Sequence, residues 1–241
     1  MKFAAVIPVF NERESLPLVV GDLRDPRIAE IVVVDNGSSD DTAAIAASLP
    51  VRLVPEPRRG YGSACLAGIA ALSTAPPDAV LFLDGDYSDH PEEAALLLDA
   101  IEAGADLAIG SRVLGRREPG ALLPQARAGN AIATFLIRRL YGHQFTDLGP
   151  FRAIRWDALR RIRMEDTDFG WTCEMQVKGV RLGLRIVEVP VSYRRRVGVS
   201  KIAGTFTGTI RAGYKILWTV ARYAATKPHP PSPSPSGEGE R

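Results

Sequence analysis

The feature that most constrains the fold of this chain is the regular alternation, through its first half, of short apolar runs and longer helical runs. The apolar runs that we expect to form strands are residues 3–7, 31–34, 51–54, 79–83 and 107–109. The intervening segments favour helices at residues 14–23, 41–48, 62–72 and 91–102. Because strands that alternate with helices assemble into β-α-β units, the pattern predicts an α/β fold with a mostly parallel sheet.

Polar residues follow the first four of these expected strands, at the points where the strands end. They are Asn11 and Glu12, the segment 35–42, the glycine-rich segment 58–62, and Asp84 with Asp86. Because the carboxyl ends of parallel strands meet at one edge of a sheet, where open α/β folds bind ligands, we expect a nucleotide-sized site there. Within it, Asp35 is placed to accept a hydrogen bond from a base or a ribose hydroxyl.

Two carboxylates, Asp84 and Asp86, stand directly after the apolar run 79–83, with Gly85 between them. Hard divalent cations such as Mg²⁺ and Mn²⁺ are held by one or two carboxylates together with phosphate oxygens, so this turn is a candidate metal site. From these residues alone a second interpretation is equally good. In it, Asp84 caps the helix that begins near Pro91, and Asp86 is solvated in a turn.

The glycine-rich segment after the third expected strand offers a phosphate contact. Arg59 supplies a guanidinium, and Gly60 and Gly62 let bare backbone approach a phosphate closely. The segment lacks the third glycine and the position of a dinucleotide-binding fingerprint. A dinucleotide oxidoreductase is therefore disfavoured.

Three motifs together resemble the family 2 glycosyltransferases. They are residues 6–12 (VIPVFNE), residues 32–42 (VVVDNGSSDDT) and the Asp84-Gly85-Asp86 turn. The similarity runs over residues 3–205 and is greatest to the branch of dolichol-phosphate mannosyltransferase-like and glucosyltransferase-like enzymes. The resemblance implies a GT-A fold, in which a nucleotide-diphospho-sugar is bound through a metal held by an Asp-x-Asp motif.

The resemblance also implies which residues form the donor site. The residues of the first half that would contact the nucleotide-sugar are Pro8, Asn11, Glu12, Asp35, Arg59, Gly60, Asp84, Gly85 and Asp86. Asp84 and Asp86 would also hold the metal cofactor, Mg²⁺ or Mn²⁺. Family members often carry Gln two residues after the second Asp, and Ser88 occupies this position here. Ser88 or a water would then complete the coordination.

A cationic segment near the end of the similar region, residues 193–201 (YRRRVGVSK), resembles the loop that closes over the donor diphosphate in this family. By that resemblance, Arg195, Arg196 and Lys201 would bind the nucleotide-sugar and neutralise negative charge on the leaving group.

The second half carries the residues that the resemblance assigns to the acceptor. Residues 110–112 (GSR) match a Gly-Ser-Arg element of the family, and Arg112 and Arg127 would clamp an acceptor phosphate. For Arg127 a surface helix charge is the other interpretation. Asp86, Arg112 and Glu174 are the residues expected to act in catalysis. Glu174 would orient substrate or serve as a base, or else it is the structural partner of a nearby arginine.

Charge is divided unevenly between the two halves. Residues 1–120 carry a net charge of −9 and residues 121–241 one of +11, which together give +2. Such an excess favours an anionic partner for the second half, namely phosphates, nucleic acid or an acidic membrane surface, unless the halves neutralise each other across a shared face. No recognisable nucleic-acid-binding motif accompanies the basic half, so we expect no nucleic acid partner.

We expect one domain over residues 1–203, with a GT-A (Rossmann-like), mostly parallel sheet and flanking helices. Residues 1–110 would form its nucleotide-sugar-binding half and residues 111–203 its acceptor half. Residues 204–226 predict an amphipathic basic helix that lies in a membrane interface or docks on the domain. The Pro/Ser-rich tail 227–241 is expected to be disordered, and no targeting or membrane-spanning segment is evident.

These patterns and the resemblance predict a metal-dependent, inverting glycosyltransferase. It would move a hexose from a nucleotide-diphospho-sugar, of UDP-glucose or GDP-mannose type, to a polyprenyl phosphate such as dolichyl or undecaprenyl phosphate. The enzyme would be cytoplasmic and peripheral at the inner face of the membrane, with an integral membrane partner left open. One alternative is a family 2 enzyme with a hydroxyl acceptor, for which Glu174 would be the base. The other is a non-catalytic nucleotide-sugar-binding protein.

Overall fold

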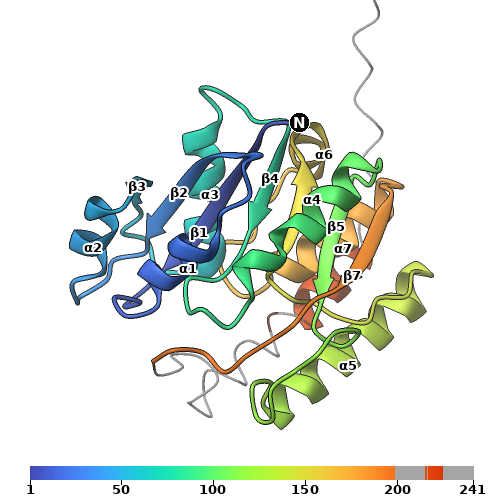
Figure 1. Ribbon diagram of the computed structural model, residues 1–241. Coiled ribbons are helices and arrows are strands. Elements are labelled where there is room, and N and C mark those ends of the chain that lie inside the picture. The colour runs from blue at the N-terminus through green and yellow to red at the C-terminus, as the bar shows by residue number, and fades with distance from the viewer. Residues whose placement is uncertain (199–214, 216, 225–241) are drawn as a thin grey trace, which may run out of the picture.

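A seven-stranded sheet forms the centre of the computed structural model, which describes residues 1–198, 215 and 217–224 (Figure 1). Its spatial order is β3-β2-β1-β4-β6-β5-β7. The first four strands in this order are parallel neighbours, β6 runs antiparallel to both β4 and β5, and β7 is parallel to β5. The strands are β1 (Phe3–Val9), β2 (Ile28–Asp35), β3 (Arg52–Pro55), β4 (Ala79–Phe82), β5 (Leu107–Ser111), β6 (Arg152–Arg155) and β7 (Ile186–Pro190).

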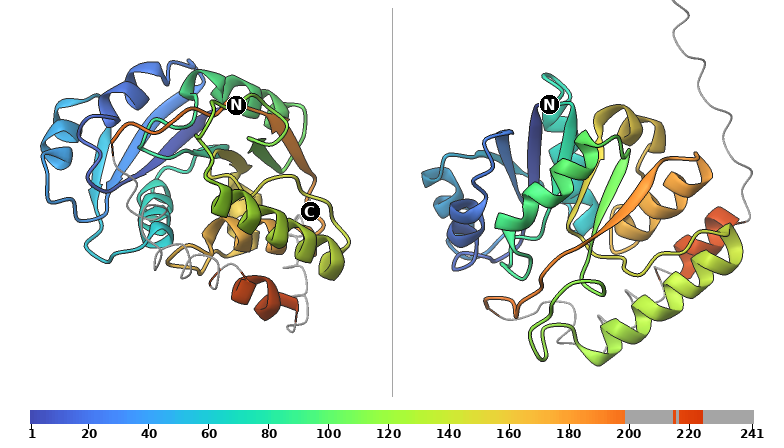
Figure 2. Two further views of the ribbon diagram at one scale, coloured as in Figure 1. Left: turned by 90° about the horizontal axis from the view of Figure 1, so that it is seen from below. Right: turned by 45° about the vertical axis from the view of Figure 1, so that its right-hand side comes forward.

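Helices cover both faces of this sheet (Figures 1 and 2). They are α1 (Leu16–Asp22), α2 (Thr42–Ser48), α3 (Tyr61–Leu72), the short 3₁₀ helix η1 (Pro91–Glu93), α4 (Ala94–Glu102), α5 (Pro124–Tyr141), α6 (Trp156–Ile162) and α7 (Trp171–Arg181). One apolar core lies between the sheet and helices α1 and α4, and a second lies between the opposite face and helices α3, α5, α6 and α7. The chain is therefore a three-layer α/β domain.

Strand β1 shows why the sequence forms this sandwich. Phe3 and Ile7 belong to the core under α1 and α4, whereas Ala4 and Val6 belong to the core under α3. Because successive side chains of a strand point to opposite faces, an uninterrupted apolar run fits a strand covered on both sides. Each fully buried Ile or Phe side chain contributes about 1.5–3 kcal/mol relative to exposure. The predicted α/β class with a mostly parallel sheet is confirmed.

Strand β6 was absent from the sequence prediction because arginines stand at both its ends. Arg152 is nevertheless fully buried, with 0% of its surface exposed. Its guanidinium donates hydrogen bonds to the carbonyl oxygens of Gly149 and, at 3.0 Å, of Thr172. A buried charge is tolerated only when its donors are satisfied in this way, and the periodicity of a sequence does not reveal such partners.

The predicted C-terminal helix is described only in part. Residue 215 and residues 217–224 are helical, whereas the rest of the range 204–226 and the tail 227–241 lie outside the described residues. The described helix docks on the domain, since Val220 and Tyr223 join the core and the Tyr141 hydroxyl donates to the Val220 carbonyl oxygen at 2.5 Å. No helix within the described part of the chain is long and apolar enough to cross a membrane.

Candidate active site

A cavity of about 560 Å³ opens at the carboxyl ends of β1, β2 and β4. Its lining residues are Pro8, Val9, Phe10, Glu12, Asn36, Arg59, Gly60, Tyr61, Ala64, Asp84, Gly85, Asp86, Asp168, Phe169 and Arg196. Figure 1 shows the segment that follows β7, in orange, running beneath the lower ends of these strands. The structure thus brings three strand ends and a segment from the other half of the chain to one site.

Most residues predicted for the donor site line this cavity; among those that the structure describes, Asn11, Asp35 and Arg195 do not. Asn11 and Asp35 instead shape the loop that follows β2. The backbone N–H of Ser39 donates to Asn11 Oδ1 at 2.7 Å, and that of Ser38 donates to Asp35 Oδ1 at 3.1 Å. Asn11 adopts a left-handed conformation, with φ +54°, which asparagine tolerates better than most residues. Contact of these two side chains with a nucleotide stays a prediction.

Asn36 is a lining residue that the sequence prediction did not single out. Its side-chain amide donates to the carbonyl oxygens of Glu56 at 3.0 Å and Arg58 at 2.7 Å. Its Oδ1 accepts the N–H of Gly60 at 2.9 Å. Asn36 thereby ties the end of β2 to the segment that carries Arg59. The sequence feature that could have identified Asn36 is its place inside the motif of residues 32–42.

Asp168 and Phe169, which also line the cavity, were missed because nothing in their local sequence marks them. They reach it through a close backbone approach at Gly60, where φ is +137°. A Cβ atom at this position would lie 2.1 Å from the carbonyl oxygen of Thr167. That carbonyl accepts the N–H of Ser63 at 2.9 Å. Gly60 is therefore required by both backbone angle and space, and it lets residues 166–169 form one wall of the cavity.

Three carboxylates gather at the end of β4, namely Asp84, Asp86 and Asp89. Burial raises the pKa of Asp84 well above its usual range, and the charges of Asp86 and Asp89 raise it further. Burial and the charge of Asp86 likewise raise the pKa of Asp89 to about 7. Oδ1 of Asp84 and Oδ1 of Asp89 are buried, and neither atom accepts a hydrogen bond from the described residues. The cluster therefore keeps two buried carboxylate oxygens without a hydrogen-bond donor, although Ser88 and Arg196 contact Asp86.

This arrangement fits a hard divalent cation. Asp84 and Asp86 both line the cavity, and the unsatisfied Oδ1 of Asp84 is an oxygen donor of the kind such cations prefer. Among the described residues no group of three or more His, Cys, Asp and Glu side chains could hold a metal alone. A cation held by Asp84 and Asp86 would therefore need phosphate oxygens and water to complete its coordination. Ser88 donates to Asp86 Oδ1 from both its N–H and its hydroxyl, at 2.9 and 2.5 Å.

Among its described residues, the cationic segment after β7 contributes Arg196 to the cavity. Its Nη2 lies 2.6 Å from Glu12 Oε1 and its Nη1 lies 3.2 Å from Asp86 Oδ2. Arg195 points elsewhere, because its guanidinium donates to the carbonyl oxygen of Pro119 at 2.6 and 2.8 Å. Lys201 lies outside the described residues.

Arg112, predicted to bind the acceptor, forms a bidentate pair with Asp147 at 2.7 and 2.8 Å. Burial disfavours its charge, but Asp147 outweighs burial and raises the pKa of Arg112. The guanidinium also lies 5.0 Å from the ring centroid of Tyr193. Arg127, in contrast, is exposed in the first turn of α5 and does not line the cavity. Neither arginine therefore lines the cavity: Arg112 is buried against Asp147, and Arg127 is exposed.

Glu174 is fully buried on α7 and does not line the cavity. Its carboxylate accepts the N–H of Asp166 at 2.8 Å and the hydroxyl of Tyr223 at 2.7 Å, and it pairs with Lys178 at 2.7 Å. These contacts fit the structural alternative, with a lysine where an arginine was expected. Because Asp168 and Phe169 line the cavity, Glu174 supports the site indirectly, through the segment that carries these two residues.

The chain matches the family model described as glycosyl transferase family 2 over residues 4–163. It is 39% identical over 213 residues to an uncharacterized glycosyltransferase of Mycobacterium tuberculosis, a match that covers 86% of this chain and 92% of the relative. It is 36% identical over 228 residues to the undecaprenyl-phosphate mannosyltransferase of Micrococcus luteus, covering 86% of this chain and 90% of the relative.

Its fold is similar to that of glucosyl-3-phosphoglycerate synthase from Mycobacterium tuberculosis, solved in complex with Mn²⁺, uridine-diphosphate-glucose and phosphoglyceric acid. The TM-score is 0.72 at 21% identity, and the match covers 92% of this chain and 79% of the other. This likeness confirms the GT-A architecture. The family model, the two relatives and the motifs around Asp84 and Asp86 agree, so the chain belongs to glycosyl transferase family 2.

Proposed function

We propose that this glycosyltransferase moves a hexose from a nucleotide-diphospho-sugar to a polyprenyl phosphate, with inversion at the anomeric carbon. The observation that carries the proposal is the cavity that holds Asp84, Asp86 and Arg196 at the carboxyl ends of the strands. The relative named as an undecaprenyl-phosphate mannosyltransferase supports the acceptor class. Membership of an enzyme family sets aside the alternative of a non-catalytic binder.

On the donor side, Asp84 and Asp86 would hold Mg²⁺ or Mn²⁺. Such an ion supplies positive charge to a diphosphate and makes it a better leaving group. Arg196, which lines the cavity and pairs with Glu12 and Asp86, can meet the same diphosphate. The Arg59 guanidinium, stacked 3.7 Å above the Phe10 ring centroid, offers a second positive charge at the cavity wall.

On the acceptor side, a phosphate monoester has a second pKa of about 6, so it is mostly a dianion at neutral pH. One of its oxygens attacks the anomeric carbon as the bond from that carbon to the diphosphate breaks, and the nucleoside diphosphate leaves with the electron pair. No proton has to be removed, so the acceptor needs positioning rather than a base. Arg112 is the candidate for this positioning from a place beside the cavity, since neither it nor the buried Glu174 lines the cavity itself.

Exposed apolar residues on α5 support peripheral contact with a membrane. We propose that the protein binds the inner face of that membrane. Ile132, Phe135 and Leu140 expose 52, 60 and 51% of their surfaces, and the helix has three arginines and no acidic residue. Figure 2 shows the described C-terminal helix, in red, beside α5 in both views. That helix exposes Leu217 and Trp218. Apolar groups flanked by cations suit an interface of anionic lipids.

Isothermal titration with UDP and GDP, each with and without Mn²⁺, tests the donor half of this proposal. We expect one of the nucleotides to bind in a Mn²⁺-dependent manner and to lose that dependence in Asp86→Asn. Asn replaces Asp86 without change of size, so the fold should persist. Binding of equal strength with and without Mn²⁺ would refute metal-assisted donor binding.

A further inference from the structure

The segment that follows β7 is bound to the turn that carries Asp86. The N–H of Arg194 donates to the Ser88 carbonyl oxygen at 2.9 Å, and the N–H of Val197 donates to the Asp86 carbonyl oxygen at 3.0 Å. Asp89 and Tyr193 form an antiparallel bridge between the same two segments. Residues 193–197 and 86–89 therefore behave as one paired unit.

The Arg194 side chain adds further contacts between these two segments. Its Nε donates to the Tyr87 carbonyl oxygen at 2.9 Å, and its Nη2 donates to the Asp89 carbonyl oxygen at 3.1 Å. Its guanidinium carbon lies 3.5 Å from the centroid of the Tyr87 ring. One side chain thus holds two carbonyls and an aromatic face of the same turn. A planar fork of donors can do this, whereas the single ammonium of a lysine cannot.

The turn needs such a fastening because Tyr87 adopts a left-handed conformation, with φ +62°. Bulky side chains rarely adopt this region, and strained residues of this kind persist only where their surroundings hold them. The Tyr87 hydroxyl is held as well, since it donates to the carboxylate of Asp22 at the end of α1.

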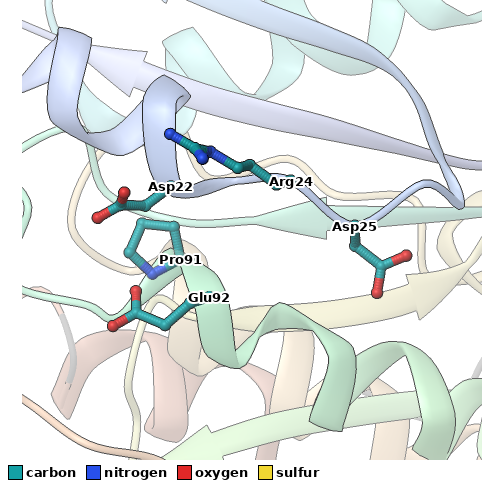
Figure 3. A pocket seen from close by; sticks show the side chains of 5 residues that line it. All are labelled: Asp22, Arg24, Asp25, Pro91 and Glu92. Carbon is teal, nitrogen blue, oxygen red and sulfur yellow. The ribbon is translucent and has the colours of Figure 1, made fainter.

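A second cavity, of about 540 Å³, is lined by Asp22, Arg24, Asp25, Pro91 and Glu92 and is separate from the one that holds Asp84 and Asp86. Figure 3 shows Asp22 and Glu92 on either side of Pro91 in this cavity. Glu92 lies 3.6 Å from Arg194 Nη2, so the guanidinium is itself held by a residue of this second cavity.

The conformation of the strained turn sets the orientation of the Asp86 carboxylate. Both the N–H and the hydroxyl of Ser88 donate to Oδ1 of Asp86, which leaves Oδ2 for the cavity, where Arg196 meets it. If Tyr87 relaxed to an ordinary conformation, the direction of the chain between Asp86 and Ser88 would change. The orientation of the Asp86 carboxylate would change with it.

We propose that Arg194 is a positioning residue of the metal site. It holds the 86–89 turn in its strained conformation and so fixes Asp86 for a divalent cation. The inference rests on the proposed metal-binding role of Asp84 and Asp86. The loss of a residue that orients a metal ligand through hydrogen bonds typically lowers the metal affinity by about 10–100-fold.

The test is the affinity for Mn²⁺, measured from the electron paramagnetic resonance signal of free Mn²⁺, with excess UDP or GDP present. We expect Arg194→Met to weaken Mn²⁺ binding by about 10–100-fold. Arg194→Lys keeps a cation over the Tyr87 ring and should bind Mn²⁺ with intermediate affinity. Arg160→Met, which removes an exposed arginine of α6, is the matched control and should leave the affinity unchanged.

Thermal unfolding of the same proteins separates a positioning role from a structural one. Unchanged Mn²⁺ affinity in both Arg194 variants, with or without a lower Tm, would overturn the inference while the metal proposal stood. Wild-type protein that bound no Mn²⁺ with either nucleotide would overturn the metal proposal and the inference together. An intermediate Mn²⁺ affinity in Arg194→Lys at wild-type Tm is the strongest supporting result.

Discussion

Nη1 of Arg196 lies 3.2 Å from Oδ2 of Asp86, although the two residues belong to opposite halves of the chain. The contact places a positive charge from the cationic segment beside the carboxylates that end β4. It also accounts for part of the charge division between the halves, because the basic half supplies cations to an acidic site. The chain therefore complements its own acidic cavity, and by our proposal the same cation meets the diphosphate of the donor.

Replacement of Arg196 by Met should lower kcat by about 10²-fold, the cost typical of removing one donor that stabilises charge in a transition state. It also leaves Glu12 and Asp86 without their shared cation. Steady-state kinetics with the nucleotide-sugar measure the effect, and Arg196→Lys should recover part of the rate. A Met variant with wild-type kcat would show that Arg196 does not act on the departing diphosphate.

Replacement of Gly60 by Ala should destabilise the protein by about 1–3 kcal/mol, because the new Cβ meets a backbone carbonyl at a positive φ. The displaced residues 166–169 form a wall of the cavity, so the KM for the donor should rise as well. Gly129→Ala in α5 is the control, since a Cβ there meets nothing within 4 Å. This control should be neutral or stabilising by up to about 1 kcal/mol. Equal Tm and KM in the two variants would contradict the close approach at Gly60.

Replacement of Glu174 by Gln should lower stability by about 1–3 kcal/mol, because a buried acceptor of several hydrogen bonds is weakened. Tyr223→Phe removes one of these bonds and should cost about 1 kcal/mol. Denaturant unfolding measures both. If kcat of the Gln variant fell by about 10²–10⁴-fold, as is typical when a general base is lost, a hydroxyl acceptor would be favoured.

Replacement of Phe135 by Ser should weaken binding to vesicles of anionic lipid by about 1.5–3 kcal/mol, the value of burying one such side chain. Flotation with vesicles of mixed phosphatidylglycerol and phosphatidylcholine measures the bound fraction. Leu96→Ser is the matched control, because Leu96 is also exposed but lies on α4. An equal loss of binding in both variants would argue against docking through α5.

The first half of the fold was predictable because its strands are short apolar runs that end in polar residues. The end of β4 at Asp84 and Asp86 is such a case, and most of the donor residues implied by the motifs do line one cavity. Local periodicity and strand ends suffice for this part, since parallel strands bring their carboxyl ends together.

The rest depends on contacts between distant segments. Arg152 lies in β6, and its buried charge is explained only by carbonyl oxygens that the fold brings to it. Asp168 reaches the cavity because Gly60 has no side chain. The left-handed Tyr87 and the guanidinium of Arg194 are in contact although 107 positions separate them in the sequence. No local pattern records such pairings.

The most direct test of the proposed reaction is mass spectrometry of the lipid product. Protein, Mg²⁺ or Mn²⁺ and a panel of nucleotide-sugars would be incubated with a short polyprenyl phosphate, with the matching free polyprenol and with 3-phosphoglycerate. We predict a hexosylated polyprenyl phosphate with one of the donors, lost on chelation of the metal and in Asp86→Asn. Hexose transfer to polyprenol or 3-phosphoglycerate, with polyprenyl phosphate left unmodified, would contradict the account.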